Sequence, residues 1–253
     1  MKFTLLGTGT SQGVPVIGCR CEVCTSSNPK DQRLRCSVLI ETETTTVIID
    51  AGPDFRQQCL RANVKKLDAV VFTHEHRDHS AGLDDIRPFN FKQNKDMEVY
   101  CTEQVEQSLK QQYEYIFADL TYPGIPKVMI RTISDEVFTI GDIEFTPIQV
   151  MHYKLPVLGF RIGDFTYITD ANFISPEERA KASNSKLLVL NALHHKPHIS
   201  HFNLEEARAV AKGIGAEQTY FTHISHYMGL HDTINNTLPN DTKLAFDGLQ
   251  LKL

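Results

Sequence analysis

The sequence has little that would direct the chain to a membrane or to nucleic acid. No apolar run approaches the about 20 residues that a membrane-spanning helix needs. Residues 1–16 are interrupted by three glycines and lack the pattern of a signal peptide. The formal net charge is −5, whereas a protein that coats phosphate backbones normally has a basic surface. We therefore expect a cytoplasmic protein with no membrane partner.

The sequence also lacks tandem repeats, low-complexity segments and long linkers. Hydrophobic residues make up 41% of the chain and charged residues 23%, a balance typical of globular proteins and not of disordered or fibrous ones. A length of 253 residues suits one large α/β domain with a substantial core. We expect residues 1–253 to form a single domain.

Cysteine is sparse, but half of the six cysteines fall within one short loop, residues 18–26. In a cytoplasmic chain such crowding favours metal binding over disulfides. Cys19, Cys21 and Cys24 are one ligand short of a tetrahedral zinc site, so a fourth must come from elsewhere. The other three lie in apolar surroundings and are expected to pack in the core: Cys36, Cys59 and Cys101.

Short β-branched runs, closed by Gly, Pro, Asp or polar clusters, predict a strand-rich chain. Strands are predicted at 2–6, 37–40, 46–49, 69–72, 97–100, 128–133, 143–150, 158–162, 165–168, 187–190 and 218–221. Helices are predicted at 53–62, 105–116 and 204–214. Two β-rich halves, each followed by helices, indicate an α/β protein with two sheets packed face to face and helices outside.

A cluster of potential metal ligands follows the apolar strand at 69–72. His74, His76, Asp78 and His79 lie within six residues. The side chains of His74 and His76, two positions apart, point the same way in an extended chain. Asp78 and His79 follow as the chain turns and can reach a second point nearby. One short segment can therefore supply ligands to two metal ions.

Three later residues of the same types stand at or just beyond the ends of apolar strands: His152, Asp170 and His223. Repeated ligands at strand ends point to one shared edge. Imidazole suits zinc and manganese, and a carboxylate can bridge two cations, so this set suffices for a binuclear centre. A single histidine is usually only a surface or core residue, but a His-x-His-x-Asp-His string directly after a strand has few structural reasons to exist.

These residues, together with Asp50 after the apolar run 47–49, resemble the five ordered motifs of the metallo-β-lactamase superfamily, over nearly the whole chain. The resemblance implies a four-layer αββα sandwich with the site along one edge of the β layers. It assigns one ion to His74, His76 and His152, a second ion to Asp78, His79 and His223, and a bridge between them to Asp170. Asp50 would orient one of the ligands from behind.

The cysteine loop is similar to one found in the PhnP-like subgroup, the phosphonate-pathway cyclic phosphodiesterases. There a Cys-x-Cys-x-x-Cys cluster and a histidine three residues beyond the last catalytic histidine hold a structural zinc. The matching residues here are Cys19, Cys21, Cys24 and His226. Such a zinc would pin the N-terminal loop to the segment that carries His223. The alternative is that the thiols are incidental.

Two cations held close together activate a water for attack on phosphorus or carbon, which makes Asp78 part of the catalytic set as well as a ligand. A departing alkoxide needs a proton, and the histidine-rich segment 194–201 offers donors. We favour His201, with His198 second. The alternatives are a solvated loop at a helix start or an additional metal site.

Arg87 follows the metal string in a segment, 82–88, that also resembles the PhnP-like subgroup. Its guanidinium could hold a phosphate oxygen, with Asp84 and Asp85 as partners of the ligands. An ordinary helix start with acidic residues in its first turn explains the same pattern equally well.

We therefore expect a hydrolase with two zinc or manganese ions and one structural zinc, acting on a small phosphodiester, with cyclic phosphodiesters among the candidates. A carboxylate at position 170 disfavours a true β-lactamase. A tRNA 3′-processing endonuclease shares the string, but the chain is acidic and has no basic Gly-rich arm, so RNA is the less favoured substrate. Lactone or thioester hydrolysis and a zinc-stabilised nucleic-acid-binding module stay open, as does a homodimer.

Overall fold

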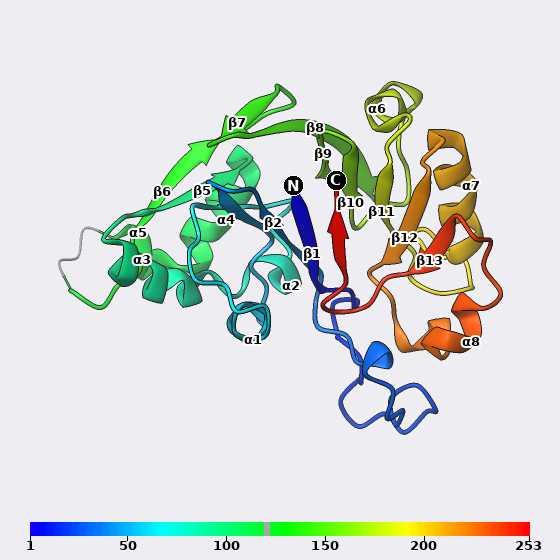
Figure 1. Ribbon diagram of the computed structural model, residues 1–253. Coiled ribbons are helices and arrows are strands. Elements are labelled where there is room, and N and C mark those ends of the chain that lie inside the picture. The colour runs from blue at the N-terminus through cyan, green and yellow to red at the C-terminus, as the bar shows by residue number, and fades with distance from the viewer. Residues whose placement is uncertain (119–121) are drawn as a thin grey trace.

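The computed structural model describes residues 1–118 and 122–253. Two seven-stranded sheets pack face to face, with strand orders β14-β1-β2-β3-β4-β5-β6 and β13-β12-β11-β10-β9-β8-β7. Helices α1 to α5 cover the first sheet and α6 to α8 lie beside the second (Figure 1). This is the α/β sandwich that the sequence predicts.

The strands have the following bounds. The first sheet holds β1 (Lys2–Gly7), β2 (Ser37–Glu41), β3 (Thr46–Ile49), β4 (Ala69–Val71), β5 (Met97–Cys101), β6 (Val128–Thr132) and β14 (Gln250–Lys252). The second holds β7 (Phe138–Ile140), β8 (Ile143–His152), β9 (Leu155–Ile162), β10 (Phe165–Ile168), β11 (Leu187–Asn191), β12 (Gln218–Thr222) and β13 (Thr242–Leu244).

The helices are α1 (Phe55–Arg61), α2 (Arg77–Ser80), α3 (Arg87–Gln93), α4 (Glu103–Gln112), α5 (Glu114–Phe117), α6 (Pro176–Ala182), α7 (Leu204–Ile214) and α8 (His231–Asn235). Short 3-10 turns lie at Pro29–Asp31, Leu83–Ile86 and His226–Met228. Among the described residues, no helix is long and apolar enough to cross a membrane.

Alternation along the strands produces three cores. On β1, Phe3 and Leu5 face the space between the sheets, while Leu6 faces the helices that cover the first sheet. The stacked rings of Phe3 and Phe165, 3.9 Å apart, join the two sheets directly. A third core lies between the second sheet and its helices. With both faces covered, the central strands are apolar throughout, which is why their sequences are easy to recognise.

The parallel strands of both sheets place their carboxyl ends where the ligands are needed. Strand β3 is parallel to β4, and β10 is parallel to β11, which is parallel to β12. Loops that follow parallel strands emerge at one edge of a sheet, which is where α/β proteins bind ligands. Asp50, His74, Asp170 and His223 all follow such strands. The fold therefore gathers residues that are far apart in the sequence.

The prediction of one helix over 105–116 is wrong, because the chain forms α4 and α5 with a break at Tyr113. Tyr113 has non-helical backbone angles, φ −126° and ψ 44°. Its ring is buried, and its hydroxyl donates to the carbonyl of Ser80 (2.9 Å) and accepts from the N–H of Leu83 (3.3 Å). These tertiary contacts with the loop after the metal string outweigh the local preference for helix.

Candidate metal centre

Asp170 lies at the middle of the cluster and faces ligands on two sides. Its Oδ1 is 3.3 Å from Nε2 of His79, and its Oδ2 is 3.2 Å from Nε2 of His223 and 3.9 Å from Nε2 of His74. Two ligand atoms on one tetrahedral metal, each at about 2.1 Å, stand about 3.4 Å apart. The spacing around Asp170 is therefore that of atoms sharing a cation.

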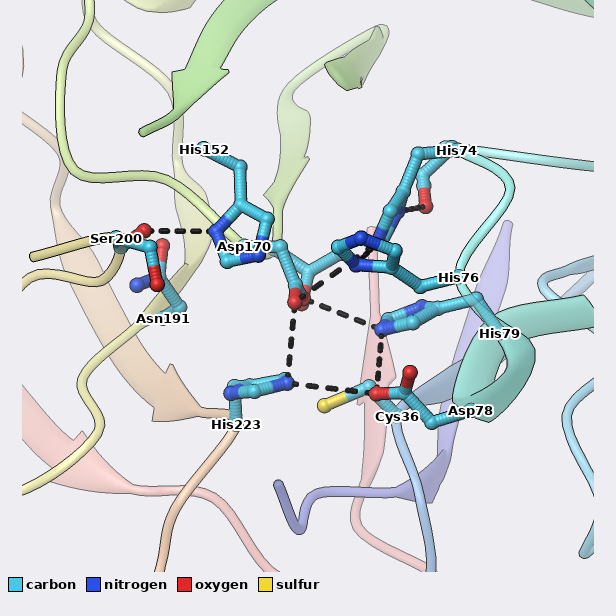
Figure 2. A network of polar contacts seen from close by, with 12 residues as sticks. Cys36, His74, His76, Asp78, His79, His152, Asp170, Asn191, Ser200 and His223 are labelled. Carbon is cyan, nitrogen blue, oxygen red and sulfur yellow. Dashed lines mark hydrogen bonds and ion pairs between the residues drawn. The ribbon is translucent and has the colours of Figure 1, made fainter. Parts of the chain in front are cut away.

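The predicted ligands divide into two groups that share this carboxylate (Figure 2). Ligand atoms of Asp78, His79, Asp170 and His223 lie within 4.8 Å of one another, and so do those of His74, His76 and Asp170. The His152 ring is 5.2 Å from the His76 ring and 6.0 Å from the His74 ring. Asp170 is common to both groups, and the ligand atom of His152 is grouped with those of Asp170 and His201.

Several buried nitrogens have no hydrogen-bond partner within the described chain. Nε2 of His79 and both ring nitrogens of His223 are fully covered and unbonded. A buried polar atom without a partner costs about 1–3 kcal/mol, so such atoms in a native fold call for an explanation. Metal binding by Nε2 would remove the cost for that nitrogen in both rings. The donor set of imidazoles and carboxylates fits zinc or manganese.

Backbone strain is concentrated at the same place. Asp50, Asp170 and His223 have φ values of 64°, 53° and 56°, a left-handed conformation that non-glycine residues seldom adopt. Tyr153, next to His152, has φ 59°. Such strain persists where the surroundings over-determine it, and it clusters at functional sites. Three strand-end loops thus bend sharply to aim side chains at one point.

Asp50 lies behind the predicted ligands and contacts one of them. It is fully buried, its Oδ2 accepts from Nδ1 of His79 at 2.7 Å, and its Oδ1 accepts from the N–H of Thr73 at 2.9 Å. Thr73 Oγ1 is in turn 2.9 Å from Nδ1 of His74. Since each Nδ1 is engaged outward, each Nε2 is left to face the centre. Thr73 is a residue that sequence reasoning missed.

Gly52 lets α2 approach this support closely. A Cβ at Gly52 would lie 2.0 Å from the carbonyl oxygen of Asp78, a distance no side chain can occupy. The α2 turn, which begins at Arg77 and carries Asp78 and His79, therefore depends on a residue without a side chain at position 52.

The electrostatics follow from burying many titratable groups together. Burial alone would lower the pKa of His79 and His223, but the carboxylates around Asp170 outweigh it, so the pKa of His79 lies well above its usual value and that of His223 rises to about 9. Burial, together with the positive charge of His79, holds the pKa of His74 well below its usual value. The cluster of carboxylates thus attracts positive charge, which cations supply when they bind.

His201, the favoured proton donor, lies against the ligands. It is buried, and its ring is 4.5 Å from the rings of both His152 and His223. Burial, followed by the charge of His223, lowers its pKa to about 2, so the ring is neutral on its own. His198 is exposed, 5.3 Å from the His201 ring. The structure thus brings both candidates to one side of the cluster, with His201 nearer.

His201 also has the position of a ligand. Its ligand atom lies within 4.8 Å of those of His152 and Asp170. Its Nδ1 is buried without a hydrogen-bond partner in the described chain. This unbonded nitrogen is available to a proton or to a substrate atom.

Arg87 stands apart from the cluster. It begins α3 and its guanidinium pairs with the carboxylate of Asp84, which also accepts from the hydroxyl of Tyr115. Within the described residues, neither Arg87 nor Asp84 forms a hydrogen bond or ion pair with a predicted ligand. The role of Arg87 in holding phosphate gains no support from this geometry.

Asn191 is a further supporting residue that the sequence did not reveal. It ends β11, is fully buried, and forms two hydrogen bonds of 2.9 Å with the backbone N–H and carbonyl of Ala171, the residue after Asp170. The sequence did offer one signal for this role, because Asn191 is a polar residue at the end of an apolar strand. Ser200 acts similarly, since its carbonyl accepts from Nδ1 of His152 at 2.8 Å.

The three cysteines of the 18–26 loop surround His226. Their Sγ atoms lie 3.4, 3.4 and 3.5 Å from its Nδ1. Bonds of about 2.3 Å to sulfur and 2.0 Å to nitrogen in a tetrahedral site give a separation of about 3.5 Å. The N–H of Cys24 and the ring of His226 lower the pKa of Cys21 to about 6, which favours its thiolate at neutral pH. These four residues fit one structural zinc.

Comparison with known proteins agrees with the site. The family model described as β-lactamase superfamily domain matches residues 45–224. A solved diphosphatase from the PhnP family is 40% identical and superposes with a TM-score of 0.93, over 100% of this chain and 97% of that one. The probable metallo-hydrolase YhfI of Bacillus subtilis is 25% identical over 93% of this chain and 94% of its own.

A second relative has a different kind of name. An octanoyltransferase of Porphyromonas gingivalis is 38% identical over 99% of this chain, which spans only 51% of that relative's length. Because the aligned part is half of a longer protein, that name need not describe it. The matching family model, the PhnP-family structure and the ligand geometry agree with one another, and the chain belongs to the metallo-β-lactamase superfamily, within which it resembles the PhnP family.

Proposed function

We propose that the protein is a binuclear metal-dependent phosphodiester hydrolase that acts on a small, cyclic or linear, substrate. The observation that carries this proposal is the Asp170 carboxylate, which belongs to two groups of closely spaced ligand atoms, one with Asp78, His79 and His223 and the other with His74 and His76. The similarity to a PhnP-family diphosphatase supports phosphorus chemistry. The acidic chain supports a small substrate over RNA.

Each part of the site has a role in this proposal. His74, His76 and His152 would hold one ion and Asp78, His79 and His223 the other, and Asp170 would serve both sets. When bound, the ions supply an activated water and neutralise charge on the phosphoryl oxygens. Asp50 and Thr73 fix the ligand rings. His201 gives a proton to the departing oxygen, and the negative charge of a phosphate beside it favours its protonated form.

A second candidate is thioester hydrolysis. The similarity to half of an octanoyltransferase favours it, since that name denotes acyl chemistry. A binuclear site also serves carbon esters, because the attack on a carbonyl develops the same kind of oxyanion.

The first test is hydrolysis of bis(p-nitrophenyl) phosphate and of an octanoyl thioester by protein that has been chelated and then reloaded with manganese or zinc. We expect metal-dependent release of p-nitrophenol, and none from the chelated protein. Turnover of the thioester alone would replace the phosphodiesterase proposal with the second candidate.

Metal content separates the enzyme from a zinc-stabilised binding module. The enzyme requires three ions per chain, two in the Asp170 cluster and one in the cysteine loop, whereas the module requires one. We expect elemental analysis of the reloaded protein to give three. A value of one that does not rise at saturating metal would contradict the binuclear proposal.

A further inference from the structure

A groove opens directly on the ligand cluster along the turn between β8 and β9. Its volume is about 530 Å³, and it is lined by His76, His152, Tyr153, Lys154, Leu155, Ile199 and Ser200. Two of the proposed ligands form its inner wall, and the rest of its surface is mainly apolar. Nothing in the proposed chemistry uses the outer residues Tyr153, Lys154 and Ile199.

Tyr153 is held there at a cost. Its φ of 59° is unfavourable for any residue with a side chain other than Asn or Asp, and its N–H donates to Oδ1 of Asn172 at 2.7 Å. The side chain is nevertheless 51% exposed, so burial does not compensate for the strain. A half-exposed aromatic ring on a strained backbone, next to the candidate metal centre, suggests a role in binding.

Lys154 adds a positive charge to the same surface. Its Nζ lies 5.3 Å from the centre of the Tyr153 ring, a cation–π distance. Lys154 is not among the lysines that form ion pairs with carboxylates in residues 1–118 and 122–253. Ile199, on the facing loop, is 67% exposed. The groove thus offers a ring, an ammonium group and an apolar side chain.

Asn172 ties the two walls together. Besides accepting from Tyr153, it donates through Nδ2 to the carbonyl of Ile199 at 3.1 Å, and its N–H donates to the carbonyl of Met151 at 2.8 Å. Ile199 lies on the segment that leads to His201. The groove therefore lies on the side of the cluster where the proposed proton donor stands, and a proton donor faces the leaving group.

We propose that this groove is the leaving-group subsite and binds a flat aromatic group that carries a negative charge, of the class of a nucleoside monophosphate. The inference rests on the proposed function for its orientation. The Tyr153 ring stacks on the base, Lys154 contacts the phosphate, and Ile199 covers the apolar face. An aliphatic leaving group would leave the ring unused, and an uncharged one would leave the ammonium group unused.

The test is calorimetric titration of the manganese-loaded protein with AMP, and with inorganic phosphate as the reference ligand. For Tyr153→Leu we expect AMP affinity to fall about tenfold, the order of one lost stacking contact, and phosphate affinity to change less than about twofold. Tyr153→Asn serves as a second variant, because Asn tolerates the left-handed backbone. Tyr122→Leu, at an exposed tyrosine that lines a different hollow, is the matched control.

Unchanged AMP affinity in both Tyr153 variants would overturn the subsite, and so would AMP binding no tighter than phosphate in the wild type. Turnover of bis(p-nitrophenyl) phosphate by the same preparations separates the two proposals. Tyr153-dependent AMP binding without turnover would contradict the hydrolase alone. Turnover with Tyr153-independent AMP binding would contradict the groove alone.

Discussion

At the scale of single residues, the proposed function depends most on Asp170, and we expect both its charge and its position to be required. Asp170→Asn keeps the shape of the side chain and tolerates the backbone φ of 53°. We expect the rate of hydrolysis to fall by more than about 100-fold. Mutating a residue that only hydrogen-bonds to a metal ligand already lowers activity or metal affinity by about 10–100-fold. Circular dichroism should show an intact fold and elemental analysis a loss of metal. Retained turnover would contradict the bridging role.

His201 can be separated from the ligands by the leaving group. A departing p-nitrophenolate needs little protonation, whereas an alkoxide needs a proton, and general acids contribute about 10²–10⁴-fold. We expect His201→Gln to lower kcat by that factor on 2′,3′-cyclic AMP and by much less on bis(p-nitrophenyl) phosphate. His198→Gln, on the exposed side, is the matched control. Equal losses on both substrates would assign His201 to metal binding.

At the scale of elements, strands and their end loops could be predicted well, because buried strands carry long apolar runs. The strands at 46–49 and 165–168 and the helix at 204–214 have the predicted ends. Helix α6 was missed although Ser175 caps it by accepting from the N–H of Glu178. Short edge strands such as β13 and β14 carry too few residues to show a period.

The site shows the same division. The candidate ligands stand out in the sequence because metal binding requires their residue types and spacing. Asn172 and Asn191 instead act through hydrogen bonds to distant backbone atoms, and Thr73 acts through the side chains of Asp50 and His74. No pattern of neighbours in the sequence marks such contacts. Arg87 illustrates the reverse case. Its local pattern fits phosphate binding and an ordinary helix start equally well, and in the structure it begins α3 and pairs with Asp84.

The cysteine loop behaves as one element with a structural task. Cys21→Ser removes one of four zinc ligands and frees residues 18–26 from His226. We expect a fall in melting temperature of several degrees, and a smaller fractional loss of activity in the protein that remains folded. Arg20→Ser, an exposed change in the same loop, should melt like the wild type. Equal melting of Cys21→Ser would contradict the zinc pin.

At the scale of the whole molecule, a buried polar network joins the N-terminal segment to the second sheet and α8. Arg33 donates to the Thr8 hydroxyl (2.8 Å), to the carbonyl of Ala245 (2.6 Å) and to Nδ1 of His231 (3.1 Å). The N–H of His231 donates to Asp31 at 2.7 Å. These contacts hold the segment between the cysteine loop and β2 against α8 and the end of the second sheet.

This network makes stability depend on pH through His231. Burial, followed by the charges of Arg33 and Lys30, lowers its pKa to about 4 in the folded chain, against 6.5 for an ordinary histidine. The unfolded chain therefore binds a proton first as the pH falls. The stabilisation is complete above pH 6.5 and is lost progressively toward pH 4, by at most about 1.4 kcal/mol per pH unit.

His231→Gln keeps an acceptor for Arg33 but cannot titrate. Urea unfolding of both proteins between pH 7.5 and 4.5 should show a shallower loss of unfolding free energy for the variant below pH 6.5. The metal ligands titrate in both proteins, so their contribution cancels in the difference between the two curves. If the unfolding free energies of both proteins fell in parallel with pH, protonation of His231 would not be the cause of the acid destabilisation. A difference confined to the interval below pH 6.5 would place the acid-sensitive contact of the fold between Arg33 and α8, outside the catalytic cluster.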